Sequence, residues 1–320
     1  IIDENIVDDA ENRGIEPLPN LEFKFVTANT LIGLPDEGGQ HELSNPEEEL
    51  KVLEELRTEY LQSSGKKKNK IKERFLRLQK NAFKKHDNLF FNRESRAYKL
   101  MSWNPFKDEA STWFDPEWMY GISKFDIVIG NPPYKEISDK NEKKWFSKNY
   151  KLVISKHYDL YIFFFKKSID LLKKDGILSF ITPHTFQHYT QFIALRRFLY
   201  LNKLLKISGS ISKVFKNAVV DVSITLIKKG DGNDNKTDFI DFGLKDKNLI
   251  INSKKTLLQN EYTAKSLNIQ SILDYKKLLS ISKNCYPLGE ITESCQGITV
   301  YAKVQGEKNN YFSTSKLNNF

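Results

Sequence analysis

The chain has 320 residues, 39% of them hydrophobic and 12% aromatic, which is enough apolar material for one large globular domain and part of another. This composition excludes a disordered chain. The sequence contains no run of about 18 apolar residues, so no membrane-spanning helix is predicted. Cys285 and Cys295 are too few for a zinc framework or a disulfide scaffold, and residues 1–9 lack the basic region of a secretory signal. We therefore expect a reduced, cytoplasmic protein.

The charge is distributed unevenly along the chain. Residues 1–62 hold 16 acidic and 4 basic side chains, a net charge of −12, whereas the whole chain has a net charge of +9. The remaining residues therefore carry +21, which suits a polyanion such as nucleic acid. A solvated, lysine-rich surface is the alternative explanation of the same excess.

The first predicted element is a strand over residues 21–28, where polar and apolar side chains alternate after two prolines. Asn29 follows at its carboxyl end, and Leu31 comes two residues later. An Asn in this place can also simply initiate a turn.

Residues 48–61 and 66–85 both repeat apolar side chains at helical spacing and are separated by a Ser-Ser-Gly break. We predict a helical hairpin inserted between two strands of the sheet. The basic helix over residues 66–85 could lie against DNA or could be a solvated arm. The solvated arm is favoured, because runs of charged residues are usually exposed to solvent. The cations concerned are Lys66, Lys67, Lys68, Lys70 and Arg74. Residues 90–120 are rich in aromatic side chains, which we expect to cover the sheet.

Residues 125–134 read FDIVIGNPPY and are the most informative stretch of the chain. The apolar run predicts a buried parallel strand, and Gly130 followed by two prolines predicts that it stops there. Asn131 and Tyr134 would then be exposed at the carboxyl end of the strand, where open α/β sheets place their ligands.

The Asn-Pro-Pro-Tyr turn has a physical logic for methylating a planar amine. The nitrogen is a poor nucleophile because its lone pair is delocalised into the ring. The Asn131 amide oxygen and the Pro132 carbonyl could accept the two amine hydrogens and localise that lone pair. Pro132 and Pro133 would keep both acceptors aimed, and Tyr134 offers a flat face for a base.

This stretch resembles the Asn-Pro-Pro-Tyr motif of the adenine-specific DNA amino-methyltransferases, in particular the TaqI-like and fused type II restriction-modification methylases. The resemblance implies S-adenosylmethionine as methyl donor, and duplex DNA with a flipped adenine as substrate. It also implies cofactor contacts at Asn29, Leu31 and Asp159, and stacking of the adenine on Phe215. Asp159 could instead cap its own helix, and Phe215 could be an ordinary core residue.

The elements after the motif agree with this resemblance. We predict a short helix within residues 135–156, an amphipathic helix that starts within residues 157–161 and runs to 174, and a strand over 177–182. Four further strands are predicted at 203–208, 222–228, 237–242 and 247–253. His184 and His188 are four residues apart on a predicted helix, but no third ligand accompanies them, so no metal site is predicted.

The fold expected is a partial doubly wound α/β methyltransferase sheet. Residues 1–44 would belong to a truncated catalytic part, 45–88 to the hairpin, 89–265 to the methyltransferase core, and 266–320 to a connecting helix and the start of a target-recognition domain. No glycine-rich turn for the methyl donor occurs, so we expect an internal fragment with an incomplete S-adenosylmethionine site and no activity alone.

Three further possibilities remain open from the sequence. A fused nuclease would lie outside this chain. Asn-Pro-Pro-Tyr can serve any planar amine, so a protein-glutamine or ribosomal-RNA amino-methyltransferase is a rival. A non-catalytic DNA-binding module that retains the fold is another.

Overall fold

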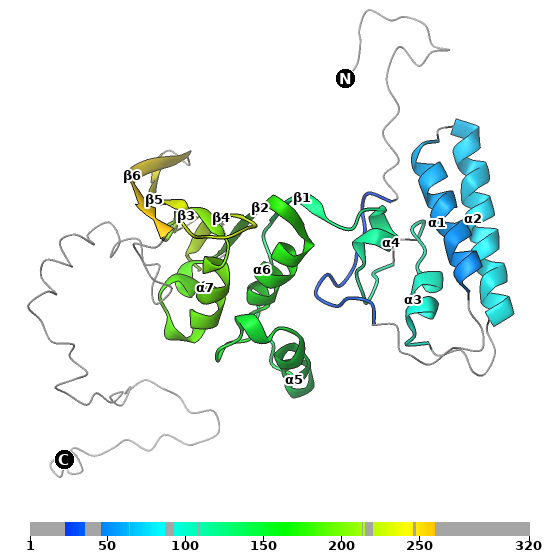
Figure 1. The fold of residues 1–320 in the computed structure, drawn as a ribbon, viewed down its shortest axis with the longest axis horizontal. Coiled ribbons are helices and arrows are strands. Elements are labelled where there is room, and N and C mark those ends of the chain that lie inside the picture. Colours follow the sequence, from blue (N-terminus) through cyan, green and yellow to red (C-terminus); the bar gives the residue numbers. More distant parts are fainter. Residues whose placement is uncertain are drawn as a thin grey trace, which may run out of the picture. The chain divides into compact units, whose positions relative to one another are not determined.

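The computed structural model describes residues 23–35, 46–63, 65–86, 93–107, 109–212, 214, 220–245 and 248–259, and all of these belong to one compact unit, residues 1–273. The helices are α1 (Glu47–Leu61), α2 (Gly65–His86), α3 (Arg96–Ser102), α4 (Pro116–Tyr120), α5 (Lys140–Asn149), α6 (Leu160–Leu171) and α7 (Ile193–Tyr200) (Figure 1). Short 3-10 turns are η2 (Lys151–Val153), η3 (His184–Gln187) and η4 (Thr190–Phe192). The strands are β1 (Phe125–Gly130), β2 (Leu172–Pro183), β3 (Lys203–Ser208), β4 (Val222–Lys228), β5 (Lys236–Lys245) and β6 (Asn248–Leu258).

The six strands form one sheet in the order β1-β2-β4-β3-β5-β6. β1 pairs with β2 in parallel, as β3 does with β5, and the other neighbours are antiparallel. Helix α6 is the crossover between β1 and β2, which is the connection that a parallel pair requires. The predicted α/β fold is confirmed. No helix within the described ranges is long and apolar enough to cross a membrane.

The core of the sheet region is built on α6. Tyr161, Phe165 and Ile169 recur every fourth residue, so they share one face of the helix, and all three are buried. They belong to a cluster that also contains Leu178 of β2 and Leu195 of α7. Burial of each such side chain is worth about 1.5–3 kcal/mol, which holds the helices against the sheet.

The prediction that β1 is buried is wrong in this chain. β1 lies at one edge of the sheet, and Ile127 and Ile129 are 65% and 80% exposed. Val128 points the other way and packs against the core, as the alternation of a strand requires. The apolar run predicted that both faces of β1 are buried. No described residue covers the face that carries Ile127 and Ile129, and no described strand pairs with the edge of β1 opposite β2.

The junction between α6 and β2 also differs from the prediction. The helix ends at Leu171 rather than at residue 174, and β2 starts at once with Leu172. The register with β1 shifts between Phe125 and Ile127, and Asp175 takes a φ of 65°. A Cβ on Gly176 would lie 3.0 Å from the Asp126 carbonyl oxygen, so glycine permits the two strands to approach here.

The helical hairpin is present as α1 and α2, which pack side by side (Figure 1). The predicted strand over residues 21–28 is absent: the described part of this segment forms only an isolated parallel bridge between Ala28 and Ser111. Phe23 is instead buried against the hairpin. Among the described residues the hairpin therefore does not lie between two strands of the sheet.

The aromatic residues that follow the hairpin mostly pack on it rather than on the sheet. Trp103 and Trp113 are buried in a cluster with Leu53 and Tyr60 of α1 and Phe75 of α2. This cluster has enough apolar surface of its own to compete with the sheet for the aromatic segment. The expectation that these side chains cover the sheet was wrong for this reason.

Candidate functional site

The Asn-Pro-Pro-Tyr turn leaves the carboxyl end of β1. Gly130 pairs with Phe180 of β2, and a Cβ on Gly130 would lie 3.3 Å from the Phe180 ring, so glycine fits this close approach. Asn131 is exposed, and its side-chain amide forms no hydrogen bond with any described residue. Pro132 is buried, whereas Tyr134 is half-buried. The turn therefore presents an unengaged amide beside an anchored proline.

Tyr134 is fixed by its hydroxyl group. The phenol donates a hydrogen bond of 3.2 Å to the carbonyl oxygen of Ile181 on β2. Burial raises the pKa of the Tyr134 phenol above its ordinary value of 10.0, so the hydroxyl keeps its proton at neutral pH. The ring is therefore a neutral, tethered platform at the carboxyl end of two parallel strands.

A short antiparallel pairing brings Asp159 next to the motif. The Ile137 amide donates to the Tyr158 carbonyl at 3.0 Å, and the Leu160 amide donates to the Lys135 carbonyl at 2.9 Å. Glu136 and Asp159 consequently face each other across an isolated bridge. The start of α6 thus lies beside the segment that follows Tyr134, and the cofactor contact that the resemblance implies for Asp159 stays a prediction.

The carboxylate of Asp159 is not a helix cap. Asp159 occupies the position before α6, but its side chain makes no capping hydrogen bond. Its Oδ2 atom lies 3.6 Å from Nδ1 of His157. Burial raises the pKa of the Asp159 carboxyl, helped by the nearby Glu136 charge and opposed by His157. The capping alternative is therefore wrong, and this half-buried carboxylate is available to another group.

Glu136, His157 and Asp159 are the residues in the described ranges that could hold a cation together. Their ligating atoms lie within 4.8 Å of one another. Glu136 is exposed, which is common for acidic groups that bind no metal. Sequence reasoning missed this cluster, because the bridge that joins positions 136 and 159 has no local signal.

Asn29 and Leu31 lie apart from the motif in their hydrogen bonding. The Asn29 Oδ1 atom accepts from the Leu31 amide at 3.3 Å, which is the turn that the alternative reading predicted. The backbone N–H of Asn29 donates a hydrogen bond to the Ser111 carbonyl oxygen at 2.9 Å. Leu31 is buried, and its carbonyl accepts a 2.6 Å hydrogen bond from the Tyr150 hydroxyl. Among the described residues, neither forms a hydrogen bond with the Asn131–Tyr134 turn, so their cofactor role stays a prediction.

Phe215 lies outside the described residues, and its stacking role stays a prediction. The connecting helix and recognition domain expected over residues 266–320 also lie outside them. His184 and His188 do meet, with ring centroids 5.2 Å apart. They belong to no metal-ligand group of the described chain.

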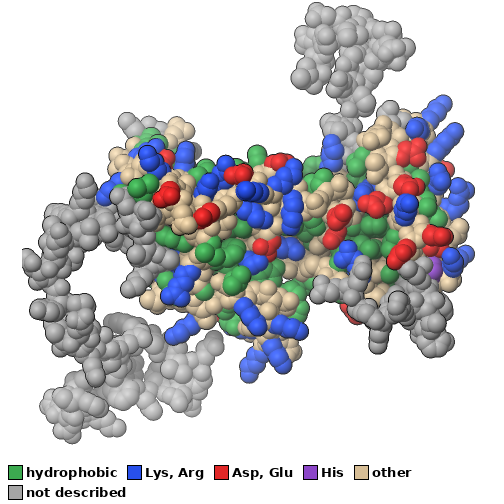
Figure 2. Space-filling view, in the orientation of Figure 1, with side chains coloured by type: hydrophobic (Ala, Val, Ile, Leu, Met, Phe, Trp, Pro, Cys, Tyr) green, Lys and Arg blue, Asp and Glu red, His purple; other side chains and the backbone are tan. Residues whose placement is uncertain are grey.

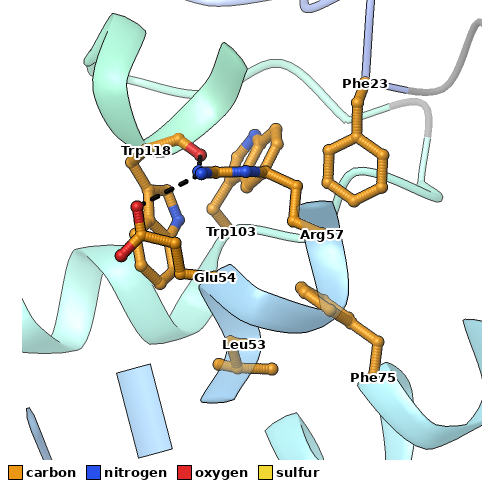
Figure 3. A pocket seen from close by; sticks show the side chains of 7 residues that line it. All are labelled: Phe23, Leu53, Glu54, Arg57, Phe75, Trp103 and Trp118. Carbon is orange, nitrogen blue, oxygen red and sulfur yellow. Dashed lines mark hydrogen bonds and ion pairs between the residues drawn. The ribbon is translucent and has the colours of Figure 1, made fainter. Parts of the chain in front are cut away.

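The small pocket at the hairpin is packed interior rather than a ligand site. Figure 3 shows Arg57 pointing from α1 toward Glu54 and Trp118. Its guanidinium donates to the Glu117 carbonyl at 3.0 Å, to the Trp118 carbonyl, and to Glu54 at 3.2 Å. The space that Phe23 and its neighbours line does not admit a water molecule. Arg57 therefore joins α1 to α4.

Residues 26–215, more than half of the chain, match the Eco57I restriction-modification methylase family. The chain therefore belongs to this family of methylases, in agreement with the resemblance carried by the motif.

Two curated relatives are each 30% identical to this chain. The type II restriction enzyme and methyltransferase RM.Eco57I of Escherichia coli matches over 198 residues, 59% of this chain and 19% of its own length. The type II methyltransferase M.AccI of Acinetobacter calcoaceticus matches over 194 residues, 55% of this chain and 35% of its own length. The chain thus spans between about a fifth and a third of these relatives.

Among solved structures, the type IIG restriction endonuclease BpuSI aligns with a TM-score of 0.40 and 16% identity, covering 55% of this chain and 24% of that one.

Proposed function

We propose that this chain carries the acceptor half of a site that methylates the exocyclic amine of adenine in DNA, as part of a restriction-modification enzyme. The observation that supports this proposal most directly is the Asn131 side-chain amide, which is exposed and forms no hydrogen bond with a described residue. It lies at the carboxyl end of β1, next to Pro132 and Tyr134, whose hydroxyl is held by Ile181. Membership of a restriction-modification methylase family supports DNA as the substrate. Membership of this family also supports a cytoplasmic location for the protein.

The Asn131 side chain and the Pro132 carbonyl would hold the amine. Each oxygen accepts one amine hydrogen, which draws the nitrogen toward a tetrahedral state and localises its lone pair. The amide is able to do this because no described side chain or backbone group competes for its oxygen. Pro132 and Pro133 donate no hydrogen bond and restrict φ, so both acceptors stay aimed at one point.

Tyr134 would stack on the base after it has left the helix. The target amine is paired inside the duplex, so the nucleotide must first be extruded. The hydrogen bond from Tyr134 to Ile181 fixes the orientation of the ring before the base arrives. Phe215 would be the second face of this stack. The neutral Tyr134 hydroxyl already donates its hydrogen bond to Ile181, so the ring would serve as a stacking surface for the adenine and not as a proton acceptor.

S-adenosylmethionine, when bound, supplies an electrophilic methyl group on a sulfonium. The amine held by Asn131 and Pro132 would be the acceptor of that methyl group, and its surplus proton would pass to solvent. Asp159 fits a role beside the donor, because its carboxylate caps no helix and lies next to the motif. The Asn29 side chain is exposed, and its Oδ1 atom accepts a hydrogen bond from the Leu31 amide.

The test is methylation of unmethylated duplex DNA by the enzyme expressed from its complete reading frame. We expect Asn131→Ala to lower the rate by about 10²–10³-fold, the typical effect of removing one polar group that stabilises a transition state. Asn141→Ala, an exposed asparagine on α5, is the matched control and should methylate normally. The 320-residue chain alone should be inactive.

Equal methylation by wild type and Asn131→Ala would refute the amine grip. Methylation of RNA or of protein glutamine, with none of DNA, would refute the proposed substrate. An active 320-residue chain would show that its donor site is complete.

A further inference from the structure

Helix α2 carries a row of cations that plays no part in holding the hairpin together. At 100° per residue, six of its basic side chains fall within an arc of about 120° on one side of the helix. This basic stripe consists of Lys66, Lys70, Arg74, Arg77, Lys80 and Lys84, all of them exposed. It runs for about 27 Å along the helix at 1.5 Å per residue. Glu73, the one acidic side chain of α2, falls within the same arc, so the arc carries a net charge of +5.

The stripe is not neutralised by the neighbouring helix. α1 has three glutamates in its first turn, but the α2 cations nearest to α1 carboxylates lie outside the stripe: Lys67 is 3.3 Å from Glu59, and Lys85 is 2.7 Å from Glu49. For the six stripe residues, no carboxylate of the described chain lies within 4.0 Å. Figure 2 shows basic side chains gathered over α2 and acidic ones over α1.

The opposite face of α2 is already occupied. Ile71, Phe75 and Ala82 are buried, and the first two belong to the cluster that α1 and the aromatic segment share. A helix that binds a lipid surface needs a free apolar face, and α2 has none. The stripe is therefore a charged surface on a rigid, packed helix, and its complement is a polyanion rather than a membrane.

We propose that the basic stripe of α2 binds the phosphate backbone of duplex DNA. A duplex carries one charge per roughly 1.7 Å, so about 27 Å of it presents more phosphates than the stripe has cations. Contacts of this type position a protein on DNA without reading its sequence. The choice of DNA over another polyanion rests on the proposed function, whereas the location of the surface rests on α2 alone.

The experiment compares two double variants of the 320-residue chain that remove the same charge from the same helix. Lys70→Gln with Arg77→Gln removes two stripe cations, and Lys67→Gln with Lys85→Gln removes two cations that pair with glutamates of α1. Gln has a helix propensity close to those of Lys and Arg, so both variants should keep α2 folded, which far-ultraviolet circular dichroism checks.

Binding to a nonspecific duplex is measured by fluorescence anisotropy from about 50 to 200 mM salt, where counterion release dominates. For the stripe variant, the slope of log K against log salt should be less negative by about 2, because each of the two lost phosphate contacts contributes about −0.9 to that slope. The control variant should lose less than half as much.

Equal losses from the two variants, or no binding of duplex DNA by the wild-type chain, would overturn the proposal. Tighter binding of duplex RNA than of duplex DNA would overturn the choice of partner. The stripe proposal is tested by the salt dependence of duplex binding and the methyl-transfer proposal by the methylation rate of Asn131→Ala, so the two fail in different measurements.

Discussion

The α1–α2 hairpin and the β1 edge of the sheet place similar apolar residues in opposite surroundings. In the hairpin, Phe75 is 3% exposed and packs edge-on against Phe23 and Phe106. On β1, Ile129 is 80% exposed although it lies in a far more apolar stretch than the lysine-rich helix that carries Phe75. The hairpin shares a closed core with Phe23 and the aromatic segment, whereas no described residue covers the outer face of β1. Apolar composition alone thus does not distinguish a core from an open edge.

The largest expected effect lies in the hairpin core. Phe75→Ala removes a buried ring and leaves a cavity, so it should lower the free energy of unfolding by about 3–5 kcal/mol. Ile129→Ala is the comparison on β1 and should cost less than about 0.5 kcal/mol, because little surface is buried there. Urea unfolding followed by circular dichroism measures both. Similar losses from the two variants would mean that β1 is covered in solution.

A smaller loss is expected from the polar contact that joins α1 to α4. Arg57→Ala removes a buried guanidinium that binds the carbonyls of Glu117 and Trp118. Hydrogen bonds to a charged group contribute about 1.5–3 kcal/mol, so we expect a loss near the top of that range. Lys51→Ala, exposed on the same helix, is the control and should be nearly neutral. An unchanged midpoint for Arg57→Ala would contradict the role assigned to this contact.

The smallest effect concerns pH at the site. Folding raises the pKa of Asp159 above its ordinary value of 3.8, so the folded chain binds more protons than the unfolded chain between these two values. Stability should therefore fall as the pH rises through this window. Asp159→Asn removes the titrating group and should flatten this part of the profile, as measured by urea midpoints at pH 3.5–6. A profile identical to wild type would show that Asp159 does not titrate in this way.

Local pattern predicted the elements with strong periodicity or strong stop signals. The two hairpin helices, α6, and strands β1 to β6 were anticipated because apolar spacing and glycine or proline boundaries act within a few residues. The end of α6 was misplaced because Leu172 pairs with Phe125 of another strand, which outweighs local helix propensity. The strand expected before Asn29 failed similarly, since Phe23 is buried against the hairpin.

The site divides in the same way. The sequence alone determined the Asn-Pro-Pro-Tyr turn and its position at a strand end, because proline and glycine limit the backbone regardless of context. Only the tertiary structure decided that Asp159 lies beside the segment after the motif, that Tyr134 is tethered to Ile181, and that no described strand pairs with the second edge of β1. These features depend on contacts between segments far apart in the chain, and no local pattern records which partner a side chain will meet.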